Sequence, residues 1–138
     1  MKNLLLLFLF AFLLQNCTPI WTTGIGQVTS IKPEKNESNE WDLIVMDAQY
    51  DSFLASEARP KSMYTEQYLK SKNTFLVQEW NSYYYSRAYS KVIESTIDYN
   101  PSEKYGLDFE YKLYQVFAMV NSRYGVPFNH LGQMDKRR

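Results

Sequence analysis

An apolar stripe near the end of the sequence constrains the fold more than any other feature. Its members recur at steps of three or four residues: Phe109, Leu113, Val116, Phe117, Val120 and Tyr124. This spacing predicts an amphipathic helix that begins near Asp108, and Gly125 supplies the left-handed residue that commonly ends a helix. A continuous apolar face must be covered, so the chain needs further elements that pack against it.

A second stretch, residues 63–85, contains neither Gly nor Pro. Its apolar residues again recur at helical spacing, at positions 69, 76, 80 and 83, with 64, 68 and 75 beside them. The pattern predicts a long amphipathic helix. A strand over residues 74–77 is the alternative, because a short apolar run also suits a strand.

Two segments have the pattern of strands. Residues 41–47 read WDLIVMD, a short apolar run that favours a central strand buried on both faces. Residues 91–99 alternate apolar and polar side chains and predict a second strand, which a turn at Asn100 and Pro101 ends. Residues 25–31 allow one further short edge strand.

A short helix is expected between the first strand and the long helix. Asp51 is predicted to cap this helix, which contains Phe53, because a carboxylate accepts hydrogen bonds from the free amides of a first turn. Pro60 ends the helical region, since its ring disfavours helical geometry in the preceding residue. The sequence thus predicts an α+β fold, in which a small two- or three-stranded sheet packs with one long and one medium amphipathic helix.

The start of the sequence has the pattern of a secretory signal. Lys2 precedes an apolar run at residues 4–14, which is too short for a comfortable membrane span of about 20 residues. Cys17 is the only cysteine, and residues 14–17 (LQNC) resemble the lipobox of bacterial lipoproteins, in which the cysteine is acylated and the chain is cut before it. A signal with an incidental, unlipidated cysteine and an uncleaved anchor are the alternatives.

This interpretation divides the chain into four parts. Residues 1–16 form a signal peptide, 17–39 a lipid anchor point with a flexible tether, 40–126 a single globular α+β domain and 127–138 a C-terminal tail. The tether is inferred from composition, because a segment rich in Thr, Gly, Ser, Asn, Lys and Glu cannot bury enough surface to fold alone.

Location and charge limit the partners that we expect. Acyl chains on Cys17 would hold the protein on a membrane, stably if two or three chains are present. Thr18 differs from the aspartate that retains similar lipoproteins at the inner membrane, so the outer membrane, facing the periplasm, is the expected site. Removal of residues 1–16 leaves 14 basic and 15 acidic residues, because Lys2 is the only charge removed. This balance argues against a nucleic-acid partner.

Several residues between positions 41 and 125 occur in an order that is known from one protein family. They are Trp41 to Asp47, Phe53, Leu54, Ala55, Tyr64, Tyr68, Asn73, Val77, Glu79, Trp80, Asn81, Ile97, Asp98, Tyr99, Tyr105, Gly106, Tyr111, Leu113, Tyr114, Tyr124 and Gly125. In this order the chain resembles a family of small bacterial lipoproteins that is classed as a domain of unknown function. The resemblance implies an envelope lipoprotein and assigns no catalytic residue.

The sequence offers few groups for metal or nucleophilic chemistry. Structural zinc needs about four Cys or His ligands, and the chain contains only Cys17 and His130. Asp98, Asn100 and Ser102 have the alternating spacing of a calcium loop, but its glycine and bidentate glutamate are missing, and a capped turn is the alternative. Since His130 lies in the predicted tail, no nucleophile has an evident base. We therefore predict no metal, no cofactor and no nucleophilic site.

Paired carboxylates are the remaining enzymatic option. Asp47, Glu79 and Asp98 lie beside aromatic residues, and glycoside cleavage needs two carboxylates about 5 to 10 Å apart. Trp80 and Tyr83 could stack on a sugar ring. Each acid also has a structural interpretation, as a strand end, a turn or an ion-pair partner. A small enzyme that acts on cell-wall glycan is therefore the alternative function, and not the leading one.

A group of aromatic residues is the best candidate for a binding surface: Trp80, Tyr83, Tyr84, Tyr85 and Tyr89. Three consecutive tyrosines on a helix point about 100° apart, so at least one should face solvent. Coverage of one end of the core is the alternative interpretation. The leading hypothesis is a lipid-anchored, non-enzymatic periplasmic module that binds or supports another envelope component, either a protein or a glycan.

Overall fold

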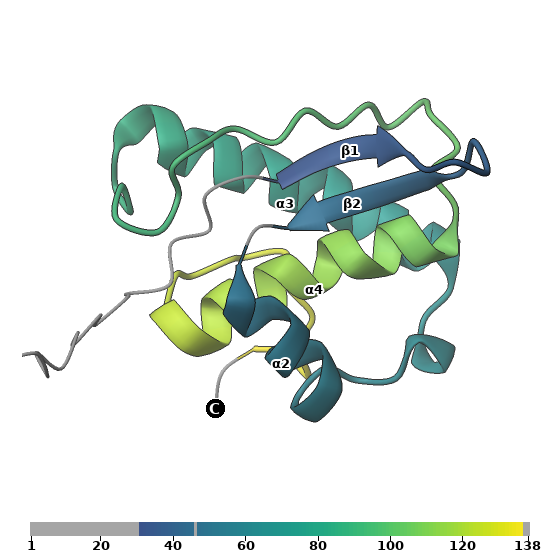
Figure 1. Cartoon of the computed structure of the whole chain (residues 1–138). Helices are drawn as coiled ribbons and strands as arrows, with labels where there is room; N and C mark the ends of the chain where they lie inside the picture. Colours follow the sequence, from purple (N-terminus) through teal and green to yellow (C-terminus); the bar gives the residue numbers. More distant parts are fainter. Residues whose placement is uncertain (1–30, 46, 137–138) are drawn as a thin grey trace, which may run out of the picture.

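The computed structural model describes residues 31–45 and 47–136. Along the chain these residues form β1 (Ile31–Lys35), β2 (Trp41–Val45), α2 (Ala48–Ser56), a 3-10 turn (Lys61–Met63), α3 (Glu66–Ser86) and α4 (Leu107–Tyr124) (Figure 1). A two-stranded antiparallel sheet accompanies a long helix, α3, and a medium helix, α4. The predicted α+β class is therefore confirmed.

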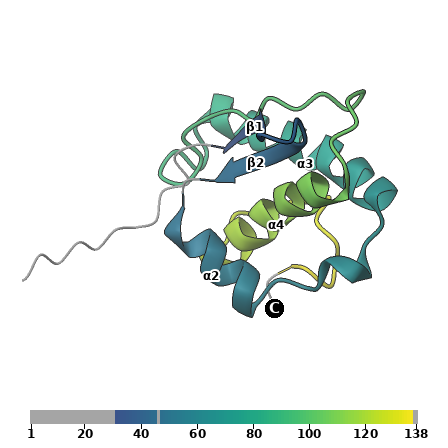
Figure 2. The same cartoon turned by 45° about the vertical axis from the view of Figure 1, so that its right-hand side comes forward.

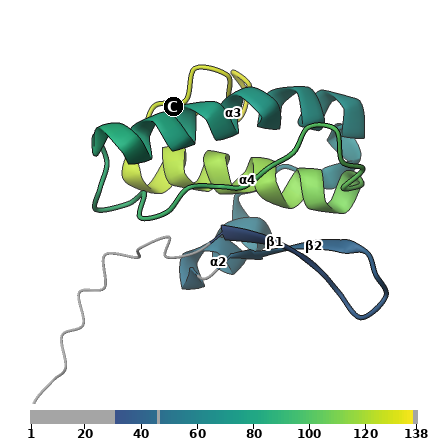
Figure 3. The same ribbon diagram turned by 90° about the horizontal axis from the view of Figure 1, so that it is seen from above.

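α4 is the central element of the fold. It lies between α3 on one side and the sheet on the other (Figure 3), and α2 packs beside it (Figure 2). The predicted stripe is buried from Phe109 to Val120, and the other faces are buried as well, because neighbours cover α4 on several sides. Two polar side chains, Glu110 and Gln115, are consequently enclosed and need partners inside the protein.

Both long helices begin and end at recognisable signals. Thr65 caps α3, since its Oγ1 accepts a hydrogen bond from Tyr68 N at 3.2 Å, and α3 ends at Arg87 in a left-handed conformation with φ 55°. α4 ends at Gly125, which is left-handed with φ 68°, as the sequence predicted. The alternative strand over residues 74–77 is wrong, because these residues lie within α3.

The sheet differs from the predicted one in its second strand. β2 falls within the predicted strand, but Ile44 is 44% exposed, so only one face of β2 is buried. Its partner is β1, which pairs Ile31 with Val45 and Lys35 with Trp41. β1 lies inside the predicted tether of residues 17–39. It starts at the last residue of the edge strand predicted over 25–31, and the rest of that segment lies outside the described residues.

The segment that joins α3 to α4, residues 87–106, is called the α3–α4 connection below. The strand predicted over residues 91–99 is wrong, because the structure has no regular strand there. Asn81 bonds to both Ile97 N (2.8 Å) and Ile97 O (3.0 Å), and Trp80 Nε1 donates to Ser95 O at 2.8 Å. These side chains on α3 occupy backbone groups that a neighbouring strand would otherwise use.

The short helix begins earlier than predicted. Asp47 is its N-cap, and its Oδ1 accepts a hydrogen bond from Gln49 N at 2.8 Å. The prediction of Asp51 as the cap is wrong, because Asp51 lies within the first turn of α2. An acidic residue is still favourable at that place, because the helix dipole is positive at its N-terminal end.

Residues 126–136, called the C-terminal segment below, belong to the folded core. The segment lies against α3 and α4 on the side away from the sheet (Figure 3). Val126, Phe128 and Leu131 are buried, and the Phe128 ring lies within 6.4 Å of the Trp80 ring, centre to centre. The folded region thus extends past the predicted bounds of 40–126 at both ends, through β1 and through this segment.

Candidate functional site

The predicted aromatic surface contains one core residue. Trp80 is 0% exposed and packs edge-on against Phe117, with its indole stacked on Phe128. Its Nε1 donates to Ser95 O, so the polar atom of the indole is also enclosed. Trp80 therefore stabilises the fold and is not placed to touch a ligand.

Tyr83 and Tyr89 form a half-buried pair at the rim of the core. Their rings meet edge-on with centroids 5.0 Å apart, and Tyr83 Oη donates to Pro127 O at 2.7 Å. Burial, followed by the nearby negative charge of Glu79, raises the pKa of the Tyr83 hydroxyl. This pair covers the end of the core, which is the alternative that the sequence left open.

Tyr84 and Tyr85 face solvent. They are 38% and 77% exposed, and their rings pack edge-on at 5.5 Å. Together with polar and charged neighbours they line a surface cavity of about 280 Å³ at the end of α3, formed by Tyr84, Tyr85, Arg87, Ser90, Ile93 and Glu94. We call this region the Tyr84–Tyr85 surface. It combines exposed aromatic faces with one cationic and one anionic side chain, a composition that suits protein or sugar partners.

The three predicted carboxylates have separate surroundings. The Glu79 carboxylate accepts hydrogen bonds from Asn129 N at 2.7 Å and from His130 N at 3.2 Å, and it also pairs with the His130 ring. Asp47 caps α2, and Asp98 is exposed. No hydrogen bond in the described part of the chain joins any two of these acids. Glu79 therefore fastens the C-terminal segment.

His130 is not the free tail residue that the sequence suggested. Its ring stacks on Phe75 with centroids 4.8 Å apart and planes 16° apart, and Nδ1 contacts the Glu79 carboxylate. The predicted calcium spacing corresponds to a turn, in which Asn100 Oδ1 accepts from Ser102 N at 3.0 Å. Within residues 31–45 and 47–136, no three His, Cys, Asp or Glu side chains gather as metal ligands.

A polar network around Asp135 was not foreseen from the sequence. The Asp135 side chain is 7% exposed and accepts hydrogen bonds from Tyr64 Oη at 2.8 Å and from Tyr114 Oη at 2.9 Å. Arg59 Nε lies 3.3 Å from the same carboxylate. Burial raises the pKa of both tyrosine hydroxyls, and the Asp135 charge adds to the effect. Nothing local in the sequence marks Asp135, because its partners are distant along the chain.

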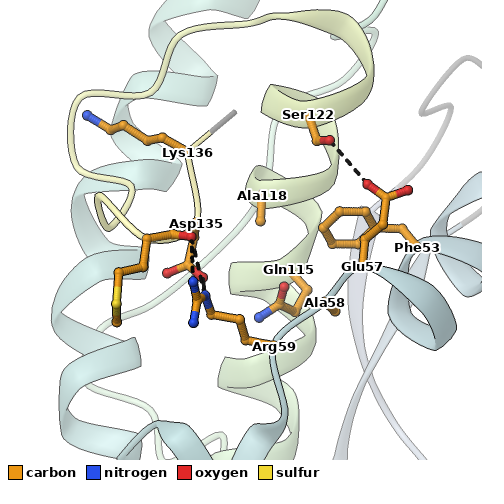
Figure 4. A pocket seen from close by; sticks show the side chains of 10 residues that line it. Phe53, Glu57, Ala58, Arg59, Gln115, Ala118, Ser122, Asp135 and Lys136 are labelled. Carbon is orange, nitrogen blue, oxygen red and sulfur yellow. Dashed lines mark hydrogen bonds and ion pairs between the residues drawn. The ribbon is translucent and has the colours of Figure 1, made fainter. Parts of the chain in front are cut away.

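The same network borders a cavity of about 310 Å³ between α2, α4 and the C-terminal segment (Figure 4). We call it the Arg59 cleft. Its lining consists of Phe53, Glu57, Ala58, Arg59, Gln115, Ala118, Ser122, Met134, Asp135 and Lys136. Gln115 interrupts the apolar residues of α4, and this is the one sequence signal that could have drawn attention to the cleft.

Another enclosed carboxylate lies at the opposite end of α4. Glu110 accepts hydrogen bonds from Asn73 Nδ2 at 2.7 Å and from Tyr99 Oη at 2.9 Å. Burial raises the pKa of the Glu110 carboxyl, although these two donors oppose the change. Since its oxygens are occupied by neighbours in the fold, Glu110 has a structural role.

Comparisons with known proteins give one match. A family model described as "Family of unknown function (DUF6146)" matches residues 4–136. No curated protein and no solved structure matches the chain. Among the described helices, none has both the length and the apolar character needed to cross a membrane.

Proposed function

The chain belongs to the family of unknown function DUF6146, and we propose that it is a lipid-anchored module of the cell envelope that binds or supports another envelope component. The partner is a protein or a glycan. The Tyr84–Tyr85 surface is the contact region. This proposal makes the molecule a binding module without enzymatic activity.

The anchor part of the proposal is supported by the sequence alone. Lys2, the apolar run at residues 4–14 and Cys17 resemble a lipoprotein signal, and they lie outside the described residues. Acylation of Cys17 would attach the protein to the outer membrane, facing the periplasm. The described domain starts at Ile31, so residues 18–30 would connect the acylated cysteine to it.

The binding part is carried by the exposure of Tyr85. A tyrosine that is 77% exposed beside the partly exposed Tyr84 leaves aromatic area in water, and aromatic residues are enriched where proteins bind partners. Arg87 and Glu94 flank the pair and could align a polar partner. The alternative enzyme gains no support from Glu79, because backbone amides of the C-terminal segment occupy its carboxylate.

Cys17→Ser tests the anchor by cell fractionation. The expected result is a loss of most membrane-bound protein, because the acylated thiol is removed, while Thr18→Ser should leave the fraction unchanged. An unchanged membrane fraction in Cys17→Ser would show that the anchor proposal is wrong.

Tyr85→Ala and the double variant Tyr84→Ala, Tyr85→Ala test the surface. Recovery of crosslinked envelope protein, or cosedimentation with purified cell-wall sacculi, should fall about fivefold or more, because an aromatic anchor commonly carries at least about 1 kcal/mol. Tyr68→Ala is the matched control, since Tyr68 is also partly exposed on α3. Equal recovery from the wild type and the double variant would exclude this contact region.

A further inference from the structure

We propose that the Arg59 cleft is a binding site for a small organic carboxylate that carries a short apolar group. The cleft lies between α2, α4 and the C-terminal segment (Figure 4), whereas the Tyr84–Tyr85 surface lies at the end of α3. The two regions share no lining residue. This inference therefore stands independently of the proposed envelope function.

The floor of the cleft comes from one face of α4. Gln115, Ala118 and Ser122 are three and four residues apart, so their side chains point to the same side of the helix. Phe53 and Ala58 add apolar atoms from the side of α2. Small side chains on the floor leave room for a ligand group about the size of a methyl or ethyl.

Hydrogen-bond donors remain available in the cleft. Arg59 uses Nε and Nη2 to bond Met134 O at 3.2 Å, and its Nη1 donates no hydrogen bond in the described part of the chain. The Lys136 side chain points away from the cleft (Figure 4), and its Nζ donates to Asn129 O at 3.3 Å. The Gln115 amide lies beside the Tyr64 hydroxyl, yet within the described residues its Nε2 has no partner of hydrogen-bonding geometry.

The two carboxylates of the cleft already have partners. Asp135 accepts from two tyrosines and contacts Arg59. Glu57 accepts from Ser122 Oγ and pairs with Arg123 at the edge of the cleft. Arg59 is the cationic side chain that reaches the cleft, because Lys136 points away from the other lining residues (Figure 4). A ligand that supplies acceptor atoms therefore complements the donors of Arg59 and Gln115.

A carboxylate meets these requirements better than a neutral acceptor. Its two oxygens suit the planar guanidinium of Arg59. The volume of about 310 Å³ is at the lower end of the range for small-molecule sites, so the ligand is small. Free amino-acid derivatives and the carboxyl end of a short peptide both present this chemistry.

Titration of the full-length protein with N-acetylalanine tests the site, with N-acetylalaninamide as the neutral control probe. Backbone NMR shifts should appear at Ala118 and Ser122 and at the side-chain amide of Gln115. The amide probe should bind about tenfold more weakly or worse, because it lacks the charge that strengthens these hydrogen bonds. Equal affinity for the two probes, or no shifts in the cleft, would overturn the proposal.

Two variants assign the binding to the cleft. Gln115→Met removes the buried donor at similar size, and Arg59→Lys removes the planar guanidinium at a partly exposed position while it keeps the positive charge. Each should weaken binding of N-acetylalanine about threefold to tenfold. Lys32→Gln, on β1, should leave the affinity unchanged, and so should Tyr85→Ala. If Gln115→Met fails to fold, Arg59→Lys tests the site by itself, and wild-type affinity in that variant counts against the proposal.

Discussion

The α3–α4 connection and the C-terminal segment lack regular secondary structure, but different chemistry fastens each of them. Neutral side chains hold the middle of the connection, because Trp80 donates to Ser95 O and Asn81 bonds Ile97. Carboxylates hold the C-terminal segment together with neutral contacts, such as Tyr83 Oη to Pro127 O. Glu79 accepts from the amides of Asn129 and His130, and Asp135 accepts from two tyrosines.

One turn of α3 forms hydrogen bonds with both segments. Glu79 and Tyr83 bond the C-terminal segment, while Trp80 and Asn81 bond the connection. Successive residues of a helix point about 100° apart, so this short stretch faces both neighbours at once. Two segments without regular secondary structure are thus held in place, because side chains of one helix satisfy their backbone groups.

The largest effect is expected from Trp80→Ala, because Trp80 contacts both segments. The change removes the indole from between Phe117 and Phe128 and leaves Ser95 O without its donor. Denaturant unfolding should show a loss of about 3 to 5 kcal/mol in the free energy of unfolding. Hydrogen exchange should accelerate at Ile97 N and at Gly132 N together.

Tyr85→Ala is the control for this experiment, because its ring is mostly exposed. It should change the free energy of unfolding by no more than about 0.5 kcal/mol. If Trp80→Ala loosened only one of the two segments, the view that α3 joins them through Trp80 would be wrong.

The sequence predicts the helices of this fold well, because their signals are local. The stripe from Phe109 to Val120 repeats with the period of a helix, and Gly125 marks its end. The strand predicted over residues 91–99 failed for a non-local reason. Ile97 is buried as the alternation suggests, but its backbone bonds to Asn81, 16 residues away, and not to another strand.

Contacts between residues distant in sequence also limit what can be predicted about the candidate sites. Exposure of Tyr85 follows from helix geometry, which the three consecutive tyrosines already indicated. Trp80 was assigned to the surface, although a Trp on an amphipathic helix fits the core equally well. The Asp135 network was missed because Tyr64 and Tyr114 lie 71 and 21 residues from Asp135. The C-terminal segment resembles a tail in sequence because it contains Pro127 and follows the last helix.

A smaller and more selective effect is expected from Asp135→Asn. Tyr64 donates to Oδ1 and Tyr114 to Oδ2, and asparagine keeps only one of these two oxygens. One tyrosine therefore loses its acceptor, and Arg59 loses its counter-ion. The free energy of unfolding should fall by about 1 to 3 kcal/mol. Hydrogen exchange should accelerate at Gly132 N and at Asp135 N, but not at Ile97 N.

Asn81→Ala should loosen the α3–α4 connection and leave the C-terminal segment in place. It removes both bonds to Ile97, so exchange at Ile97 N should accelerate while Gly132 N stays protected. Asp98→Asn is a charge control, because Asp98 is exposed, and it should alter neither segment. If hydrogen exchange accelerated at the same amides in Asp135→Asn and in Asn81→Ala, the two segments would unfold as one cooperative unit. The proposed difference between them would then be wrong.

Two charged side chains also hold the connection: Lys70 Nζ donates to Glu103 O at 2.7 Å, and the Glu110 carboxylate accepts from Tyr99 Oη. Burial raises the pKa of Glu110 above its ordinary value, so the folded protein retains a proton that the unfolded chain has released. The stability contributed by this group is therefore highest below the unfolded pKa. It falls as pH rises towards the folded pKa, by at most about 1.4 kcal/mol per pH unit.

Glu110→Gln should remove this fall. The difference between wild type and variant in the free energy of unfolding, measured from about pH 4 to about pH 7, isolates the contribution of the one group. Asp42→Asn should give a difference of opposite sign, because the hydrogen bond from Lys112 lowers the pKa of Asp42, and its stabilisation is lost as pH falls. Parallel pH profiles for wild type and Glu110→Gln would mean that burial does not penalise the charged form of Glu110. The contact between Glu110 and Tyr99 would then be insensitive to pH over this range, like the neutral contacts at Ser95 and Ile97.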